Sequence, residues 1–196
     1  MSVARAGRLR VIAGSVGGRR LVAPAGTTAR PTTDRVKESV FAALRDDRLR
    51  DAAVLDLYAG SGALAIESLS RGAARAVLVD REHAAVDAIE RNLDATGFGD
   101  RARRERVAVD AFLRHDRPAE APFDLVFLDP PYDLAPAELE RVLAGLAQPG
   151  WLASGATVVV ERGTGQTGLV QLPEAWSTRW ERSYGDTLVT VATAND

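Results

Sequence analysis

From residue 53 onward, short apolar runs alternate with segments whose apolar residues recur at helical spacing. The pattern predicts strands at 53–57, 75–80, 105–109, 123–128 and 156–161, with helices near 63–70, 83–96, 111–116 and 136–147. Strands that alternate with helices form βαβ units and a parallel sheet, which binds ligands at the carboxyl ends of its strands. Residues that follow each strand are therefore the candidates for chemistry.

Both ends of the chain depart from this alternation. Residues 176–182 and 187–190 flank a Tyr-Gly-Asp turn and predict an antiparallel hairpin, while residues 9–13 and 20–23 flank a glycine-rich turn and predict another. The sequence thus predicts an α/β fold, a doubly wound sheet that ends in an antiparallel hairpin. We expect residues 1–31 to form a basic, RNA-binding β-hairpin extension and residues 32–196 to form the main domain.

The formal net charge of −2 hides an uneven distribution. Residues 1–37 carry a net charge of +7, and the remaining residues carry −9. A basic segment joined to an acidic body indicates a nucleic-acid partner, because arginine and lysine gain affinity by neutralising phosphates. A solvated, arginine-rich terminus is the alternative, since Lys37 is the only lysine and arginine is the usual cation of this chain.

Composition also argues against several kinds of site. The chain has no cysteine and therefore no disulfide, thiol nucleophile or zinc–thiolate centre. Its two histidines, His83 and His115, lack companion ligands at useful spacing, so we expect no metal. No apolar run approaches the ~20 residues of a membrane span, and the N-terminal residues lack a secretion signal. We expect a cytoplasmic monomer that does not bind membranes.

The first predicted strand carries Asp56 and leads into the loop Tyr58-Ala59-Gly60-Ser61-Gly62. The two glycines let the backbone turn tightly, so that a ligand can approach the main chain at a helix N-terminus. The second strand ends in Asp80, whose carboxylate can accept hydrogen bonds from both hydroxyls of a ribose. This arrangement is typical of nucleoside-binding sites, those of NAD enzymes included.

Two features favour S-adenosylmethionine over a dinucleotide. Asp56 would attract the cationic methionine end of that cofactor, whereas it would repel a pyrophosphate. After the third strand come Asp110 and Ala111, at a position that resembles the adenine contact of S-adenosylmethionine-dependent enzymes. There Asp110 could accept a hydrogen bond from the adenine amino group. Capping of the following helix is an equal alternative for Asp110.

The fourth strand ends in Asp129-Pro130-Pro131-Tyr132, which joins a carboxylate, a stiff turn and an aromatic ring. Proline lacks an N–H and fixes φ, so the Pro130 carbonyl stays available as an acceptor. If this carbonyl and the Asp129 carboxylate each accept one hydrogen of an exocyclic amino group, the nitrogen lone pair can attack an activated methyl group. Tyr132 would stack on the base. A purely structural turn is the weaker alternative, given the upstream cofactor loop.

The tetrapeptide resembles the amino-group methyltransferase motif, and its aspartate, where glutamine-amide methylases usually carry asparagine, favours a base as acceptor. Segments 10–14, 30–38, 57–64 and 70–73 closely resemble the bacterial small-subunit ribosomal RNA guanine-N2 methyltransferase family, RsmD. The resemblance covers essentially the whole chain. It implies the seven-stranded class I methyltransferase fold and S-adenosylmethionine as cofactor. It also implies transfer to the exocyclic N2 amino group of guanine 966 in 16S rRNA, naked or within a small-subunit particle.

The residues and this resemblance together predict three groups of site residues. The catalytic group is Asp129, Pro130 and Tyr132; the cofactor group is Asp56, Tyr58, Gly60, Gly62, Asp80, Arg81, Asp110, Ala111, Arg30 and Thr32; the RNA-binding group is Arg8, Arg10, Arg19, Arg20 and Arg35. Two alternative functions stay open: an adenine-N6 methyltransferase acting on DNA or RNA, and a non-catalytic RNA-binding factor of ribosome assembly. The intact tetrapeptide argues against the second.

Overall fold

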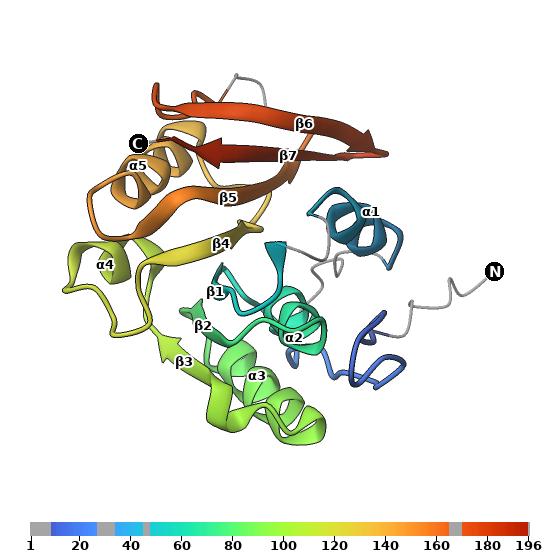
Figure 1. Ribbon diagram of the computed structural model, residues 1–196. Coiled ribbons are helices and arrows are strands. Elements are labelled where there is room, and N and C mark those ends of the chain that lie inside the picture. Colours follow the sequence, from blue (N-terminus) through green and yellow to red (C-terminus); the bar gives the residue numbers. More distant parts are fainter. Residues whose placement is uncertain (1–8, 27–33, 45–47, 165–169, 196) are drawn as a thin grey trace.

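The centre of the protein is a mixed sheet of seven strands in the order β3-β2-β1-β4-β5-β7-β6 (Figure 1). The computed structural model describes residues 9–26, 34–44, 48–164 and 170–195, with the backbone alone at Asp34 and Arg35. The strands are β1 (Ala53–Leu57), β2 (Arg75–Asp80), β3 (Ala102–Arg106), β4 (Phe123–Leu128), β5 (Leu152–Gly163), β6 (Trp176–Tyr184) and β7 (Thr187–Ala194). Strands β1 to β5 are parallel, and β7 pairs antiparallel with both β5 and β6. The predicted doubly wound sheet with a C-terminal hairpin is thereby confirmed.

Helices cover both faces of the sheet. They are α1 (Asp34–Leu44), α2 (Ala63–Ser70), α3 (His83–Thr96), the short η2 (Gly99–Arg101), α4 (Val109–Arg114) and α5 (Pro136–Leu146). Helices α1, α2 and α3 lie on one face, and α4 and α5 lie on the other (Figure 1). Every residue of β1 is buried, because Val54 packs in one core and Leu55 in the other. In the described ranges, no helix has the length and apolar character needed to cross a membrane.

The third strand lies earlier in the chain than the sequence pattern predicts. The observed strand is β3, Ala102–Arg106, and the following helix α4 begins at Val109 instead of residue 111. β3 is an edge strand whose sequence Ala-Arg-Arg-Glu-Arg has no apolar run, since charged side chains suit an exposed edge. The apolar run that suggested a strand at 105–109 instead brings Val109 into the core at the start of α4.

Residues 9–26, which we call the arm, form a short antiparallel pairing around the glycine-rich turn. The pairing is a single bridge between Arg10 and Arg20, with the Val11 N–H donating to the Arg19 carbonyl at 2.9 Å. It is therefore shorter than the hairpin that the sequence predicts. The arm also contributes three buried side chains to the core beneath α1 and α2, those of Leu9, Val11 and Leu21. The expected domain boundary at residue 31 lies outside the described residues.

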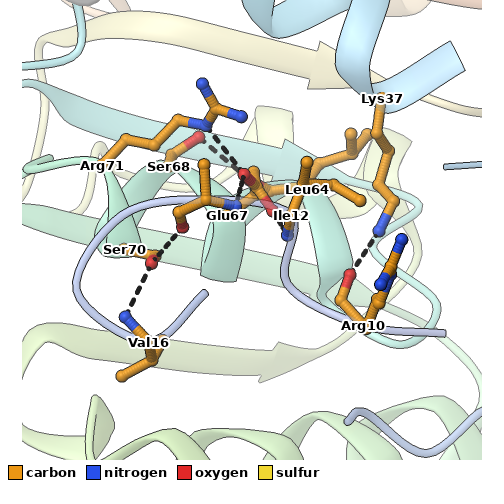
Figure 2. Close-up of polar contacts among 10 residues, drawn as sticks. Arg10, Ile12, Val16, Lys37, Leu64, Glu67, Ser68, Ser70 and Arg71 are labelled. Atoms are coloured by element: carbon orange, nitrogen blue, oxygen red, sulfur yellow. Dashed lines mark hydrogen bonds and ion pairs between the residues drawn. The ribbon is translucent and has the colours of Figure 1, made fainter. Parts of the chain in front are cut away.

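A buried carboxylate, Glu67 of α2, fixes the arm to the main domain (Figure 2). It accepts hydrogen bonds from the backbone N–H groups of Ile12 at 2.6 Å and Ala13 at 3.0 Å. Arg71 Nε donates to the same carboxylate at 2.7 Å. A fully buried charge is costly unless it is paired and hydrogen-bonded, and here three donors meet that need. The backbone N–H groups of the arm therefore replace water as hydrogen-bond donors to the Glu67 carboxylate.

The next turn of α2 holds the glycine-rich part of the arm. The Ser15 N–H donates to the Ser70 carbonyl at 2.8 Å, and the Ser70 hydroxyl donates to the Ala13 carbonyl at 2.6 Å. The Ser70 hydroxyl also accepts from the Val16 N–H at 3.2 Å (Figure 2). Gly14 has a φ of +84°, and a Cβ there would lie 2.0 Å from the Ser70 carbonyl oxygen. Glycine is thus required at this position both by the backbone conformation and by the close approach to α2.

Two further side chains join the arm to other helices. Asn92 of α3 accepts from the Val22 N–H at 2.7 Å and donates to the carbonyls of Val22 at 2.9 Å and Ser61 at 2.8 Å. Lys37 of α1, which is fully buried, donates from Nζ to the Arg10 carbonyl at 2.6 Å (Figure 2). The arm therefore lies against α1, α2 and α3 together.

We expect Glu67→Ala to lower the free energy of unfolding by about 3 kcal/mol, because it leaves two backbone N–H groups and a guanidinium without their acceptor. The control is Glu90→Ala, which removes an exposed carboxylate paired with Arg104 at 2.6 Å and should cost less than about 1 kcal/mol. Urea unfolding of both variants measures the difference. Equal midpoints would show that Glu67 does not anchor the arm.

Candidate active site

Three carboxylates gather where the central strands end. Asp56 is the penultimate residue of β1, Asp80 is the last residue of β2, and Asp129 follows β4 directly. β1 pairs in parallel with β2 on one side and with β4 on the other. The carboxyl ends of all three strands therefore meet at one edge of the sheet, where an open α/β fold binds its ligands.

The three carboxylates lie close enough to influence one another. Burial raises the pKa of the Asp56 carboxyl well above its usual value, and the negative charges of Asp129 and Asp80 raise it further. A hydrogen bond from the Ala65 N–H, 3.1 Å from Asp56 Oδ2, acts in the opposite direction. Placing negative charge at Asp56 is thus unfavourable, and a cationic ligand beside it would relieve the repulsion.

The loop between β1 and α2 has the tight conformation expected from its glycines. Gly60 has a φ of +56°, and its N–H donates to Asp80 Oδ2 at 2.8 Å. Gly62 has a φ of +74° and caps the N-terminus of α2; a Cβ there would lie 2.7 Å from Leu78 Cδ2. Asp80 Oδ1 also accepts from the Glu82 N–H at 3.0 Å. Because each carboxylate oxygen can accept two hydrogen bonds, Asp80 keeps capacity for ribose hydroxyls.

Tyr58 begins this loop in a left-handed conformation, with a φ of +61°. Burial raises the pKa of its hydroxyl to about 12, the carboxylates of Glu138 and Asp110 raise it too, and the positive charge of Arg81 lowers it. Tyr58 therefore lies between the end of β1 and the starts of α4 and α5. Positive φ is uncommon for a residue with a side chain, and such strain is found mainly at functional sites.

Asp110 lies in the first turn of α4, next to Ala111, but it is not the N-cap, which is Ala108. The Arg114 guanidinium, 2.9 Å away, together with first-turn backbone N–H groups, lowers the pKa of the Asp110 carboxyl. Asp110 is thus ionised at neutral pH and exposed beside Tyr58. Its predicted contact with adenine stays a prediction, as does a cofactor contact for Arg81, which is exposed and pairs with Glu82.

The predicted catalytic tetrapeptide forms the loop after β4. Asp129 is half-buried, Pro130 is buried, and the side of the loop away from the core carries Tyr132, which is 52% exposed. The Tyr132 hydroxyl lies 3.3 Å from Thr187 Oγ1 and the two groups hydrogen-bond. The Asp129 carboxylate, the Pro130 carbonyl and the exposed Tyr132 ring thus belong to one short loop at the end of β4. This arrangement can receive a flat heterocycle that carries an amino group.

The predicted RNA-binding arginines divide into two sets. Arg10, Arg19 and Arg20 are exposed on the arm. Arg8 lies outside the described residues, and only the backbone of Arg35 is described, at the start of α1. Arg30 and Thr32, which were predicted to contact the cofactor, also lie outside the described residues. The structure therefore places three of these arginines together on the arm, and the RNA-binding roles of all five stay predictions.

The cluster of Asp56, Asp80 and Asp129 suits a cationic nucleoside better than a dinucleotide. S-adenosylmethionine carries positive charge on its sulfonium and its ammonium group, whereas NAD would bring an anionic pyrophosphate next to a carboxylate whose charge is already unfavourable. The residues of this site fit the former. Across the described part of the chain, no three histidine or acidic side chains form a group that could hold a metal ion.

Sequence reasoning missed the residues that support the site. Glu67 and Asn92 hold the arm, and each is a polar residue on a buried helix face, a signal that the sequence contains. Glu138 lies in the first turn of α5 and affects Tyr58. The contacts of Gly163 and Thr187 with Tyr132 could not be predicted, because these two residues belong to strands far from residue 132 in the sequence.

Comparisons with known proteins agree with this geometry. A family model described as Conserved hypothetical protein 95 matches residues 9–193. Ribosomal RNA small subunit methyltransferase D of Escherichia coli (strain K12) is 38% identical over 179 residues, which cover 91% of this chain and 86% of the relative. The Putative rRNA methyltransferase YlbH of Bacillus subtilis (strain 168) is 43% identical over 124 residues, which cover 63% of this chain and 67% of the relative.

A solved structure shows the same architecture. The Putative methyltransferase yhhF from Escherichia coli has a TM-score of 0.84 and 34% sequence identity, and the match covers 96% of this chain and 99% of that chain. The family model, the relatives and the solved structure show that the chain belongs to the ribosomal RNA small subunit methyltransferase D family of S-adenosylmethionine-dependent methyltransferases.

Proposed function

We propose that this protein transfers a methyl group from S-adenosylmethionine to the exocyclic N2 amino group of a guanine in 16S rRNA, at position 966 by family resemblance. One observation carries the proposal: the Asp129–Tyr132 loop lies beside the acidic cofactor edge, with Asp129 close enough to raise the pKa of Asp56. An acceptor for amino hydrogens and a site for a cationic methyl donor are therefore neighbours. The names of its relatives support ribosomal RNA as the substrate.

The amino group of guanine is a poor nucleophile because its lone pair is delocalised into the ring. When bound, S-adenosylmethionine would supply an electrophilic methyl group on its sulfonium sulfur. Asp129 and the Pro130 carbonyl would each accept one amino hydrogen, so that the nitrogen lone pair points toward the methyl carbon. Asp129 would also stabilise the positive charge that grows on nitrogen as the C–N bond forms and the C–S bond breaks. The ammonium product then loses one proton to solvent.

Recognition of the RNA would depend on the arm and on Tyr132. Arg10, Arg19 and Arg20 are exposed, and phosphate contacts from such arginines position a nucleic acid without reading its sequence. Tyr132 offers a ring on which a base turned out of its stack can lie, a contact typically worth ~1–3 kcal/mol. Anchoring of the arm by Glu67 and Asn92 would hold these arginines in a constant position relative to the carboxyl ends of the central strands.

The proposed function is tested by supplying methyl-labelled S-adenosylmethionine with naked 16S rRNA and, separately, with small-subunit particles from cells that lack this activity. We expect label in N2-methylguanosine after digestion and mass analysis. We expect Asp129→Ala to lower kcat at least about 100-fold while cofactor affinity stays within a few-fold, because the carboxylate acts on the base.

Asp133→Ala, in the same loop and exposed, is the matched control for Asp129→Ala and should keep its activity. Label in N6-methyladenosine would instead support the adenine alternative. An absence of label in both substrates would support the non-catalytic alternative. An Asp129→Ala variant that retained most of its turnover would refute the role of this carboxylate.

We expect Asp80→Ala to weaken S-adenosylmethionine binding by about 10- to 100-fold, since it removes acceptors worth ~1.5–3 kcal/mol for the ribose hydroxyls. RNA affinity should change little, because Asp80 lies at the cofactor edge. The control is Asp87→Ala, which removes an exposed carboxylate of α3 that pairs with His83. Calorimetric titration of the three proteins measures the effect, and unchanged affinity in the Asp80 variant would contradict the assignment.

Replacing both Arg19 and Arg20 by alanine should weaken RNA binding and make it less sensitive to salt. Each lost phosphate contact lowers the slope of log affinity against log salt by about one. Side-chain substitution is preferable to deletion of the arm, because its backbone donates to buried Glu67. Arg103→Ala with Arg104→Ala on β3, where both arginines pair with glutamates, is the control. An unchanged slope in the arm variant would show that these arginines are only solvated.

A further inference from the structure

The ring of Tyr132 lies against a glycine at the end of β5. A Cβ built on Gly163 would lie 2.9 Å from Tyr132 Cδ1 and 3.4 Å from Cε1. The φ of Gly163 lies outside the left-handed region, so its backbone conformation is open to any residue. A side chain at position 163 would therefore clash with the Tyr132 ring, although the backbone conformation itself would allow one.

The far end of the same ring is held by the neighbouring strand. The Tyr132 hydroxyl hydrogen-bonds with Thr187 Oγ1 at 3.3 Å. Gly163 and Thr187 are direct partners in the antiparallel pairing of β5 with β7. The Thr164 N–H donates to the Asp186 carbonyl at 2.7 Å and continues this pairing beyond the last strand residues. The ring thus lies across one cross-strand pair and touches both of its members.

We propose that Gly163 and Thr187 are positioning residues that set the plane of the Tyr132 ring for the target base. The proposal rests on the proposed function, in which Tyr132 stacks on that base. The ring packs on Gly163, yet Tyr132 is 52% exposed, so part of the ring surface is accessible to a ligand. Because Gly163 has no side chain, the ring can lie close to the backbone of β5. The hydrogen bond to the Thr187 hydroxyl fixes the position of the far end of the ring.

A defined ring plane matters because the reacting nitrogen must lie in line with the methyl group. A displacement of about 1 Å in a catalytic arrangement can cost roughly 100-fold in rate. Support from two paired strands is more rigid than support from a loop. Gly163 and Thr187 therefore act on turnover through Tyr132, without touching the cofactor edge formed by Asp56 and Asp80.

The first test replaces Gly163 by alanine, with Gly99→Ala as control because a Cβ at residue 99 meets no atom within 4 Å. We expect Gly163→Ala to lower kcat for rRNA methylation at least about 10-fold, since its Cβ would displace the ring. The KM for RNA, which depends mainly on phosphate contacts, and the cofactor affinity should stay within about twofold. Gly99→Ala should match the unmodified protein in all three measurements.

The second test separates positioning from a general effect on folding. In a Tyr132→Ala background, Gly163→Ala should cause no further loss of kcat, because there is no ring left to displace. Thr187→Val should lower kcat, because it removes the hydroxyl. Thr187→Ser, which keeps the hydroxyl, should have the kcat of the unmodified protein. Thr178→Val, at an exposed threonine of β6, is the control for Thr187→Val.

The outcomes distinguish this proposal from the proposed function. Normal kcat in Gly163→Ala, or the same fractional loss in both backgrounds, would overturn the positioning role while leaving the methyltransferase function in place. If the unmodified protein methylates no RNA, thermal unfolding midpoints still test whether Gly163 contacts the Tyr132 ring. The four proteins to compare are the unmodified protein, Gly163→Ala, Tyr132→Ala and the double variant. Gly163→Ala should then lower the midpoint only when Tyr132 is present, and equal shifts in both backgrounds would refute the contact.

Discussion

The position of β1 between β2 and β4 determines where this protein can do chemistry. The chain passes from β1 to β2 on one side and returns to β4 on the other, so the carboxyl ends of three consecutive parallel strands meet. Asp56, Asp80 and Asp129 come from segments more than twenty residues apart. The strand order nevertheless brings Asp80 and Asp129 close enough to Asp56 for their charges to raise its pKa. Full burial of β1 makes the edge rigid, since both cores hold it.

Concentrated negative charge explains the choice of ligand better than the glycine loop does. A loop with two glycines binds many nucleotides, and its backbone geometry is the same for a dinucleotide and for S-adenosylmethionine. The buried carboxyl group of Asp56 distinguishes the two ligands. Burial and two neighbouring acids already oppose its ionisation, and an anionic pyrophosphate would oppose it further. In the proposed function, a cationic ligand beside these acids would relieve their mutual repulsion. The arm, which is held by Glu67 and Ser70 of α2, carries exposed arginines and has the opposite sign.

The sequence predicted those parts of the fold whose signal is local. The bounds of β1, β2 and β4 agree with the predicted strands, because each is a short, mostly apolar segment between turn residues. β3 was misplaced because an edge strand need not be apolar. β5 and β7 are longer than predicted because their antiparallel pairing continues to Gly163 of β5, and because β7 continues to Ala194 in its pairing with β6. The three acids of the site could be predicted since strand ends converge in a parallel sheet. The contacts of Glu67 with the arm and of Tyr132 with Gly163 could not, since they depend on distances between remote segments.

The burial of Lys37 has a consequence for chemical labelling. It is the only lysine of the chain, its side chain is fully buried, and its Nζ lies 2.6 Å from the Arg10 carbonyl. Acylating reagents that modify side-chain amines therefore have one target, and they can reach it only when the arm separates from α1. The rate of acylation at Lys37 in the folded protein would measure how often that local opening occurs. It would do so at one known residue and without any engineered probe.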